Sequence, residues 1–99
     1  MKLRDIAHSR AGDKGDIANI SVIAYAPGDY ALLVERVTAE RVAAHFAALA
    51  TGPVRRYEMP LIGALNFVLE GALGGGVTRA LRLDAHGKSL SSLMLDLEI

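Results

Sequence analysis

The stretch from His8 to Ile20 reads HSRAGDKGDIANI and holds a cluster of charges spaced by glycines at residues 12–16, GDKGD. Glycines can turn backbone N–H groups toward one point, and Lys14 adds a positive charge, so this loop could hold a carboxylate or a phosphate. It does not match the complete phosphate-binding motif GxxxxGK[ST], and no helical pattern follows it directly. The alternative is a polar turn between two strands, in which Asp13 and Asp16 bond to local backbone.

A second glycine cluster, residues 74–76, could let a ligand or another chain approach the backbone closely. Its alternative role is a flexible helix end that leads into a strand. If both clusters lie at one end of a sheet, they would frame a concave, amide-lined site with Arg56, Asn66 and Arg79 nearby. The predicted ligand-binding or partner-binding residues are Gly12, Asp13, Lys14, Gly15, Asn19, Arg56, Asn66, Gly75, Gly76 and Arg79.

Candidates for catalysis are few. His8 could act as an acid or base beside Asp13 or Asp16, although a histidine at a strand end is usually only hydrogen-bonded. The three histidines show no metal-ligand spacing, no GxSxG motif is present, and the absence of cysteine excludes thiol chemistry. The weak catalytic candidates are therefore His8 and Asp16. We predict no metal and no cofactor, and the sequence does not decide whether the chain is an enzyme.

Two further polar features need partners. Asn66 lies in the apolar segment ALNFVL, so we expect its amide to bond either to a neighbouring loop or to a ligand carbonyl. Arg55 and Arg56 are adjacent and would point to opposite faces of a strand. We expect one of them to pair with a carboxylate, either Glu58 or Asp84.

The elements that must position these residues follow from hydrophobic periodicity. Alternating or continuous apolar patterns predict strands over residues 2–9, 17–26, 54–59, 77–84 and 90–99. Apolar residues at helical spacing predict helices after Asp29 and after Thr38, which could form one bent unit, and over residues 61–72. This mixed order predicts an α+β fold, a two-layer ferredoxin-like sandwich with a mainly antiparallel sheet of about five strands and helices on one face.

Length and composition limit the class of protein. The 99 residues predict a single domain spanning 1–99, and without cysteine its core must be held by packing alone. Eleven Lys and Arg balance eleven Asp and Glu without long runs of either sign, which argues against nucleic-acid and membrane partners. The N-terminus lacks an apolar signal core, so we expect a cytoplasmic protein. Hydrophobic residues make up 52% of the chain, and this surplus predicts a homo-oligomer.

Four segments together resemble a known family: HSRAGDKGDIANISVIA, TAERV, RYEMP and ALNFVLEGALGGGVTRALRLDAHGK. From Leu3 to the end, the chain is similar to the small ferredoxin-fold domain of the AtuA-like family, the acyclic terpene utilisation proteins. One departure is Ala11, where the family's SGDKGD pattern has serine. In that family the domain follows a larger domain or is a separate short chain, and no catalytic residues can be carried over.

The resemblance implies an accessory subunit or domain that docks on a large AtuA-type protein. It would contribute a binding surface in the catabolism of acyclic terpenoid or other branched acyl compounds, including acyl-CoA. The alternative is a stand-alone small enzyme or small-ligand-binding protein that uses the charged loop at residues 12–16.

Overall fold

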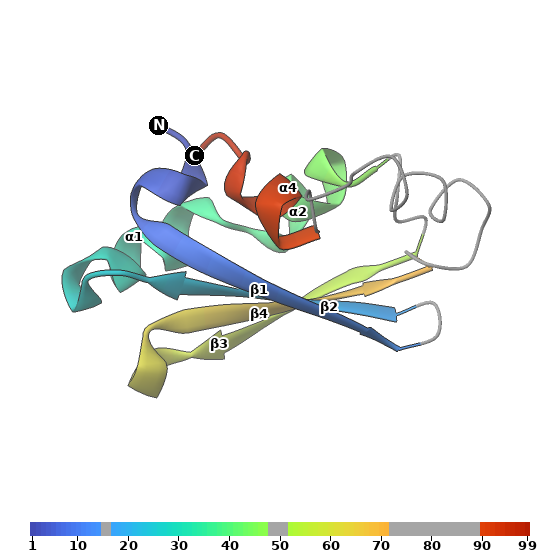
Figure 1. Cartoon of the computed structure of the whole chain (residues 1–99), viewed down its shortest axis with the longest axis horizontal. Coiled ribbons are helices and arrows are strands. Elements are labelled where there is room, and N and C mark those ends of the chain that lie inside the picture. Colours follow the sequence, from blue (N-terminus) through green and yellow to red (C-terminus); the bar gives the residue numbers. More distant parts are fainter. Residues whose placement is uncertain (15–16, 48–51, 72–89) are drawn as a thin grey trace.

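A computed structural model describes residues 1–14, 17–47, 52–71 and 90–99, with Asp13 and Lys14 described by backbone alone. In these ranges an antiparallel sheet is covered by helices on one face (Figure 1). Its strands are β1 Ala7–Lys14, β2 Ile17–Ala24, β3 Val54–Met59 and β4 Ala64–Glu70. The helices are α1 Tyr30–Arg36, α2 Ala39–His45 and α4 Leu90–Leu95, with short 3₁₀ turns η1 Leu3–Asp5, η2 Pro27–Asp29 and η3 Pro60–Ile62.

The four strands lie in the order β1-β2-β4-β3, and every neighbouring pair is antiparallel. Side chains alternate between the two faces of a strand, so the apolar residues at every second position bury one face. In the two central strands this face is fully buried and packs against the helices. Its members are Ala18, Ile20 and Val22 of β2 and Leu65, Phe67 and Leu69 of β4.

The helices complete the core from the other side. α1 buries Leu33 and α2 buries Val42, each at the helical spacing seen in the sequence, and Phe46 closes the end of α2. The Thr38 hydroxyl accepts a hydrogen bond from the Arg41 N–H at 3.1 Å, which confirms the predicted cap that starts α2. The predicted α+β class with helices on one face is therefore correct.

The prediction of a helix over residues 61–72 is wrong. Pro60 starts the η3 turn, Gly63 ends it in the left-handed conformation with φ of 63°, and β4 follows. Leu65 and Leu69 are four residues apart and fit a helix, but Phe67 between them is equally buried, which is the period of a strand. Asn66 consequently lies in a strand and points to the face opposite these three side chains.

The prediction of a strand over residues 90–99 is also wrong, because Leu90–Leu95 forms helix α4. Leucines at every second position hid a second pattern, in which Leu90, Met94 and Leu97 recur at helical spacing and face the core. Only Glu98 is sheet-like, in an isolated bridge to Lys2. The predicted strand at 77–84 lies outside the described residues. Within the described residues the sheet has four strands and not about five.

The first predicted strand is shifted along the chain: residues 3–5 form η1, and β1 begins at Ala7. The two ends of the chain lie side by side (Figure 1). The Leu3 N–H donates to the Leu97 carbonyl at 2.9 Å, and the N-terminal amine lies 3.0 Å from the Glu98 carboxylate. Among the helices that the structure describes, none is long and apolar enough to span a membrane.

Candidate binding surface

The helices described above cover only one face of the sheet, and we call the other the open face. Because residues paired across antiparallel strands point to the same side, the register sorts the open face into rows that each cross all four strands. From the end of the sheet nearest η3, the rows are His8, Ile23, Ala64 and Met59; then Arg10, Ser21, Asn66 and Tyr57; then Gly12, Asn19, Val68 and Arg55.

The centre of the open face carries a short polar network. The Ser21 hydroxyl donates to Asn66 Oδ1 at 3.1 Å, and Asn66 Nδ2 donates to Asn19 Oδ1 at 3.4 Å. The Asn66 amide thus finds its partners on a neighbouring strand and not in a loop. In the same row lies the exposed side chain of Arg10, which makes no hydrogen bond or ion pair with any residue that the structure describes.

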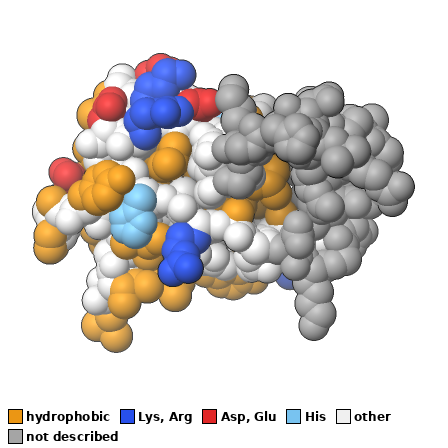
Figure 2. All heavy atoms as spheres, in the orientation of Figure 1, with side chains coloured by type: hydrophobic (Ala, Val, Ile, Leu, Met, Phe, Trp, Pro, Cys, Tyr) orange, Lys and Arg blue, Asp and Glu red, His pale blue; other side chains and the backbone are white. Residues whose placement is uncertain are grey.

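One end of the open face is apolar, and we call it the apolar end. Exposed large hydrophobic side chains gather there: Tyr25, Tyr57, Met59, Leu61 and Ile62. Figure 2 shows this concentration around the end of the sheet that carries η3. Leu61 is 100% exposed and Ile62 60% exposed, although large apolar side chains are normally withdrawn from water.

The η3 turn holds these side chains on a well-defined backbone. Pro60 fixes the first φ of the turn, and the Gly63 N–H donates to the Pro60 carbonyl at 3.2 Å. The Gly63 carbonyl in turn accepts from the Ala24 N–H at 3.0 Å, which ties the turn to the end of β2. Leu61 and Ile62 are therefore presented to solvent by a braced turn.

A ring pair lies on the other half of the same sheet end. The rings of His8 and Tyr25 have centroids 5.2 Å apart and an interplanar angle of 30°. Tyr25 is 66% exposed, while His8 is half-buried. The acidic partners predicted for His8, Asp13 and Asp16, have side chains outside the described part of the chain, so the acid–base role of His8 stays a prediction.

Arg55 and Arg56 point to opposite faces of β3, as predicted. Arg56 lies on the helix side, where its guanidinium donates to the carbonyls of Val34 at 2.8 Å and Val37 at 3.0 Å, and to Glu58 at 3.2 Å. These bonds cap the end of α1 and occupy the group, so Arg56 does not join Asn66 in one site. Arg55 lies on the open face and pairs with Glu70 at 3.3 Å.

The charged glycine loop is shorter than the sequence suggested. Gly12 and the backbone of residues 13–14 belong to β1, where Gly12 pairs with Asn19. Of the predicted binding residues, the structure brings Gly12, Asn19 and Asn66 together on the open face. Gly15, Asp16, Gly75, Gly76 and Arg79 lie outside the described residues, as does the predicted meeting of the two glycine clusters.

Sequence reasoning missed Arg10, Tyr57, Leu61 and Ile62 as surface-forming residues. The predicted helix over residues 61–72 placed Leu61 on a buried helix face and in a different element from β3. The available signal was the Pro60 and Gly63 pair between two segments of alternating character, which is typical of a hairpin turn.

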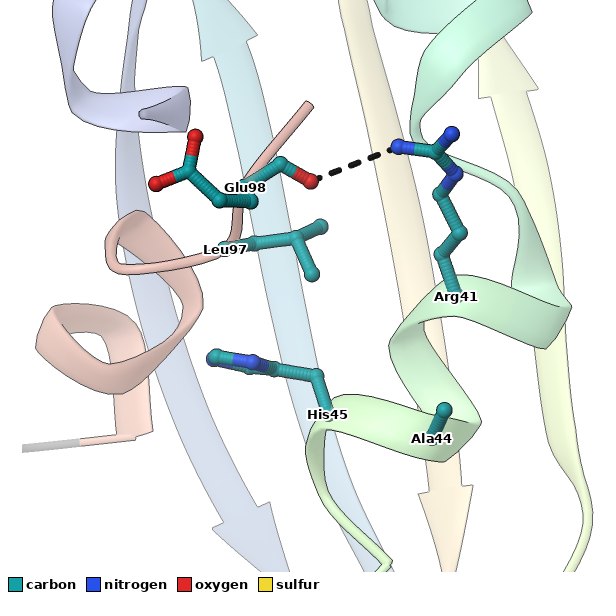
Figure 3. A pocket seen from close by; sticks show the side chains of 5 residues that line it. All are labelled: Arg41, Ala44, His45, Leu97 and Glu98. Carbon is teal, nitrogen blue, oxygen red and sulfur yellow. Dashed lines mark hydrogen bonds between the residues drawn. The ribbon is translucent and has the colours of Figure 1, made fainter. Parts of the chain in front are cut away.

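A shallow, open hollow lies between α2 and the C-terminal segment, lined by Arg41, Ala44, His45, Leu97 and Glu98 (Figure 3). Arg41 donates to the Glu98 carbonyl at 3.4 Å, and His45 Nε2 lies 2.6 Å from the Leu93 carbonyl. Both side chains hold α2 against the C-terminal segment. Among the described residues, no three His, Asp or Glu side chains gather as metal ligands would.

Comparison with known proteins gives one match. The family model of the AtuA ferredoxin-like domain matches residues 1–99, the entire chain. No curated protein and no solved structure matches it. The helix-covered antiparallel sheet agrees with the ferredoxin-like description of that family, and its match over the entire length leaves no segment unassigned. The chain belongs to the AtuA ferredoxin-like domain family.

Proposed function

We propose that this domain is an accessory binding domain of AtuA-type proteins, which associates with copies of itself and with a large AtuA-type protein. In this role it contributes a binding surface in the catabolism of acyclic terpenoid or other branched acyl compounds, including acyl-CoA. The domain acts through the open face and the apolar end, and it supplies a surface to a site that is completed by its partner.

The observation that carries this proposal is the fully exposed Leu61 on a braced turn. A side chain of this size gains roughly 1.5–3 kcal/mol when it is buried, and here it contributes none of that to folding. The same turn gathers Ile62 and Met59 beside it. Exposed apolar anchors of this kind are typical of protein interfaces, in which a few central side chains supply most of the binding energy.

A second candidate is a stand-alone small-ligand-binding protein, and Arg10 is the observation that favours it. Its guanidinium, which has no partner among the described side chains, lies in the same row as the Ser21 and Asn66 network and could hold a carboxylate or phosphate group. Ligand sites that act alone are, however, usually concave and bury most of the ligand, and the hollow between α2 and the C-terminal segment does not include Arg10. Arg10 therefore fits better as one group in a shared site.

Co-purification with a large AtuA-type protein tests the proposal. The tagged domain is co-expressed with the large protein as the wild type, as Leu61→Asp and as Ala31→Asp. Ala31 is an exposed residue of α1 on the helix side, so it receives the same new charge away from the apolar end.

We expect the wild type and Ala31→Asp to retain the large protein at equal stoichiometry and Leu61→Asp to lose most of it. Retention by none of the three would contradict docking on the large protein. Equal retention by all three would show that docking uses a surface other than the apolar end.

A further inference from the structure

We infer that two copies of this domain pair through their open faces, with the twofold axis parallel to the strands. The inference rests on the self-association in the proposed function and names the surface and symmetry that produce it. Because the large protein is proposed to dock on the same surface, the pair is the form that the domain adopts in the absence of the large protein. The result is a four-layer arrangement in which the two sheets stack and the helices lie outside. Four features of the open face support it: the order of its charges, the match of its central residues, the position of its apolar end and its area.

The charges select the direction of the axis. With the axis along the strands, β1 of one copy lies over β3 of the other and each row meets the same row. Arg10 then faces the ring of Tyr57 in the second copy, a favourable cation–π arrangement. An axis across the strands would instead place β1 over β1 and β3 over β3. Arg10 and Arg55 would then each lie over the strand that carries the same arginine in the second copy, and like charges repel.

The central residues also match under this symmetry. β2 of one copy lies over β4 of the other, so that Ser21 faces Asn66 and Ile23 faces Ala64. The polar network of each sheet meets the polar network of the other, and the row of His8, Ile23, Ala64 and Met59 meets the same row. Such self-complementarity is what a twofold interface between identical subunits requires.

The apolar end supplies the anchor. Figure 1 shows η3 on the side of the sheet opposite the helices, at the half formed by β3 and β4. The His8 and Tyr25 ring pair lies at the same end of the sheet but on the half formed by β1 and β2. The twofold axis exchanges these halves, so Leu61 and Ile62 of each copy project onto the ring pair of the other. This contact accounts for both the exposed turn and the exposed Tyr25.

The area is sufficient for a specific interface. The strands hold six to eight residues, so the open face is about 25 Å long and about 19 Å wide at standard strand spacing, or about 500 Å² on each copy. Two such faces bury about 1,000 Å² before the η3 turns are added, which reaches the lower bound for specific protein interfaces.

Engineered disulfides test the symmetry directly, because the chain contains no cysteine. We would co-express Leu61→Cys with Tyr25→Cys, each with a different tag, and oxidise the purified mixture. The expected product is a disulfide-linked pair of the two variants, at twice the 10.5 kDa chain mass. Leu61→Cys oxidised alone should remain unlinked, because η3 joins β3 to β4 and the axis places its two copies on opposite halves of the interface.

The control pair is Ala31→Cys with Tyr25→Cys, since Ala31 lies on the helix side. Linkage in the Leu61 and Tyr25 mixture no greater than in this control would overturn the inference. Linkage of Leu61→Cys to itself would overturn the proposed axis as well.

The concentration dependence of the mass, measured by analytical ultracentrifugation, separates this inference from the proposed function. We expect Leu61→Asp to weaken dimerisation at least tenfold relative to Ala31→Asp. Dimers that are equally stable in both variants would contradict the open-face interface and leave self-association intact. A monomeric wild type at micromolar concentration would contradict both self-association and this interface, while co-purification with the large protein would still test docking separately.

Discussion

At the scale of single residues, glycine has different roles in the η3 turn and in strand β1. Gly63 adopts a φ of 63°, a left-handed conformation that side chains with a Cβ disfavour, and its carbonyl braces η3 against β2. Gly12 has no positive φ, and a Cβ placed on it would meet no atom within 4 Å. The sequence drew attention to Gly12 because charges surround it, whereas the conformational requirement is at Gly63.

Gly63→Ala should therefore lower the free energy of unfolding by about 1–2 kcal/mol, the cost of a left-handed non-glycine residue. Gly12→Ala is the matched control, and it should change that free energy by less than about 0.5 kcal/mol, as at other open positions. Urea unfolding of both variants measures the difference. A larger loss at Gly12 than at Gly63 would mean that the charged loop imposes the stricter backbone requirement.

At the scale of elements, two adjacent arginines on β3 have different roles because their side chains point to opposite faces of the sheet. Arg56 joins β3 to the end of α1 through two backbone carbonyls, and Arg55 forms an exposed ion pair on the open face. Bonds from a charged donor to buried acceptors contribute more than surface ion pairs, since removal of the donor leaves the carbonyls unpaired.

Arg56→Met should accordingly destabilise the domain by about 1.5–3 kcal/mol, the range for hydrogen bonds to charged groups. Arg55→Met should cost at most about 1 kcal/mol, as is typical of exposed ion pairs. Thermal and urea unfolding of the two variants provide the comparison. Equal losses would show that the contact with α1 contributes no more than a surface pair.

Helix α4 is the second element whose role can be tested. Met94 is fully buried and Leu97 is 5% exposed, so this segment forms part of the core. Met94→Ala should cost about 2–5 kcal/mol, the range for large-to-small substitutions in cores. A chain that ends at Ser89 loses both side chains and should not fold. A cooperative melt of the truncated chain near that of the full-length chain would show that the sheet and the other helices suffice.

The helices and strands could be predicted from the sequence where the apolar residues follow a single period, either that of a helix or that of a strand. The Thr38 cap and the spacing of Leu33 and Val37 identified two helices, and VRRYEM between two prolines identified β3 with its bounds. Prediction failed where a segment fits both periods, as in ALNFVL and in the C-terminal leucines. There the choice depends on which surface is available for burial, and that is a property of the tertiary structure and not of the segment.

The open face could be predicted only in part, for the same reason. Asn19 and Asn66 were identified as polar residues in need of partners, but their contact depends on the pairing of β2 with β4, which are separated by α1, α2 and β3 in the sequence. Likewise, Leu61 has an ordinary sequence context, and its full exposure becomes evident only when η3 is seen to lie beyond the sheet.

At the scale of the whole molecule, the domain folds around a core on one side of its sheet, and the described helices leave the other side uncovered. Its helix side holds the core and the contacts between the chain ends, while the open face holds Arg10, the polar network and the apolar end. In the account proposed here, the open face has no complete site of its own and acquires one when a partner covers it.

Native mass spectrometry of this chain, a large AtuA-type protein and a branched acyl-CoA tests that claim most directly, because it weighs each assembly together with any bound ligand. We predict a complex of both proteins that retains the acyl-CoA, and a small chain that retains none when measured alone. Stoichiometric retention of the acyl-CoA by the small chain alone, or the absence of any complex between the two proteins, would contradict the account.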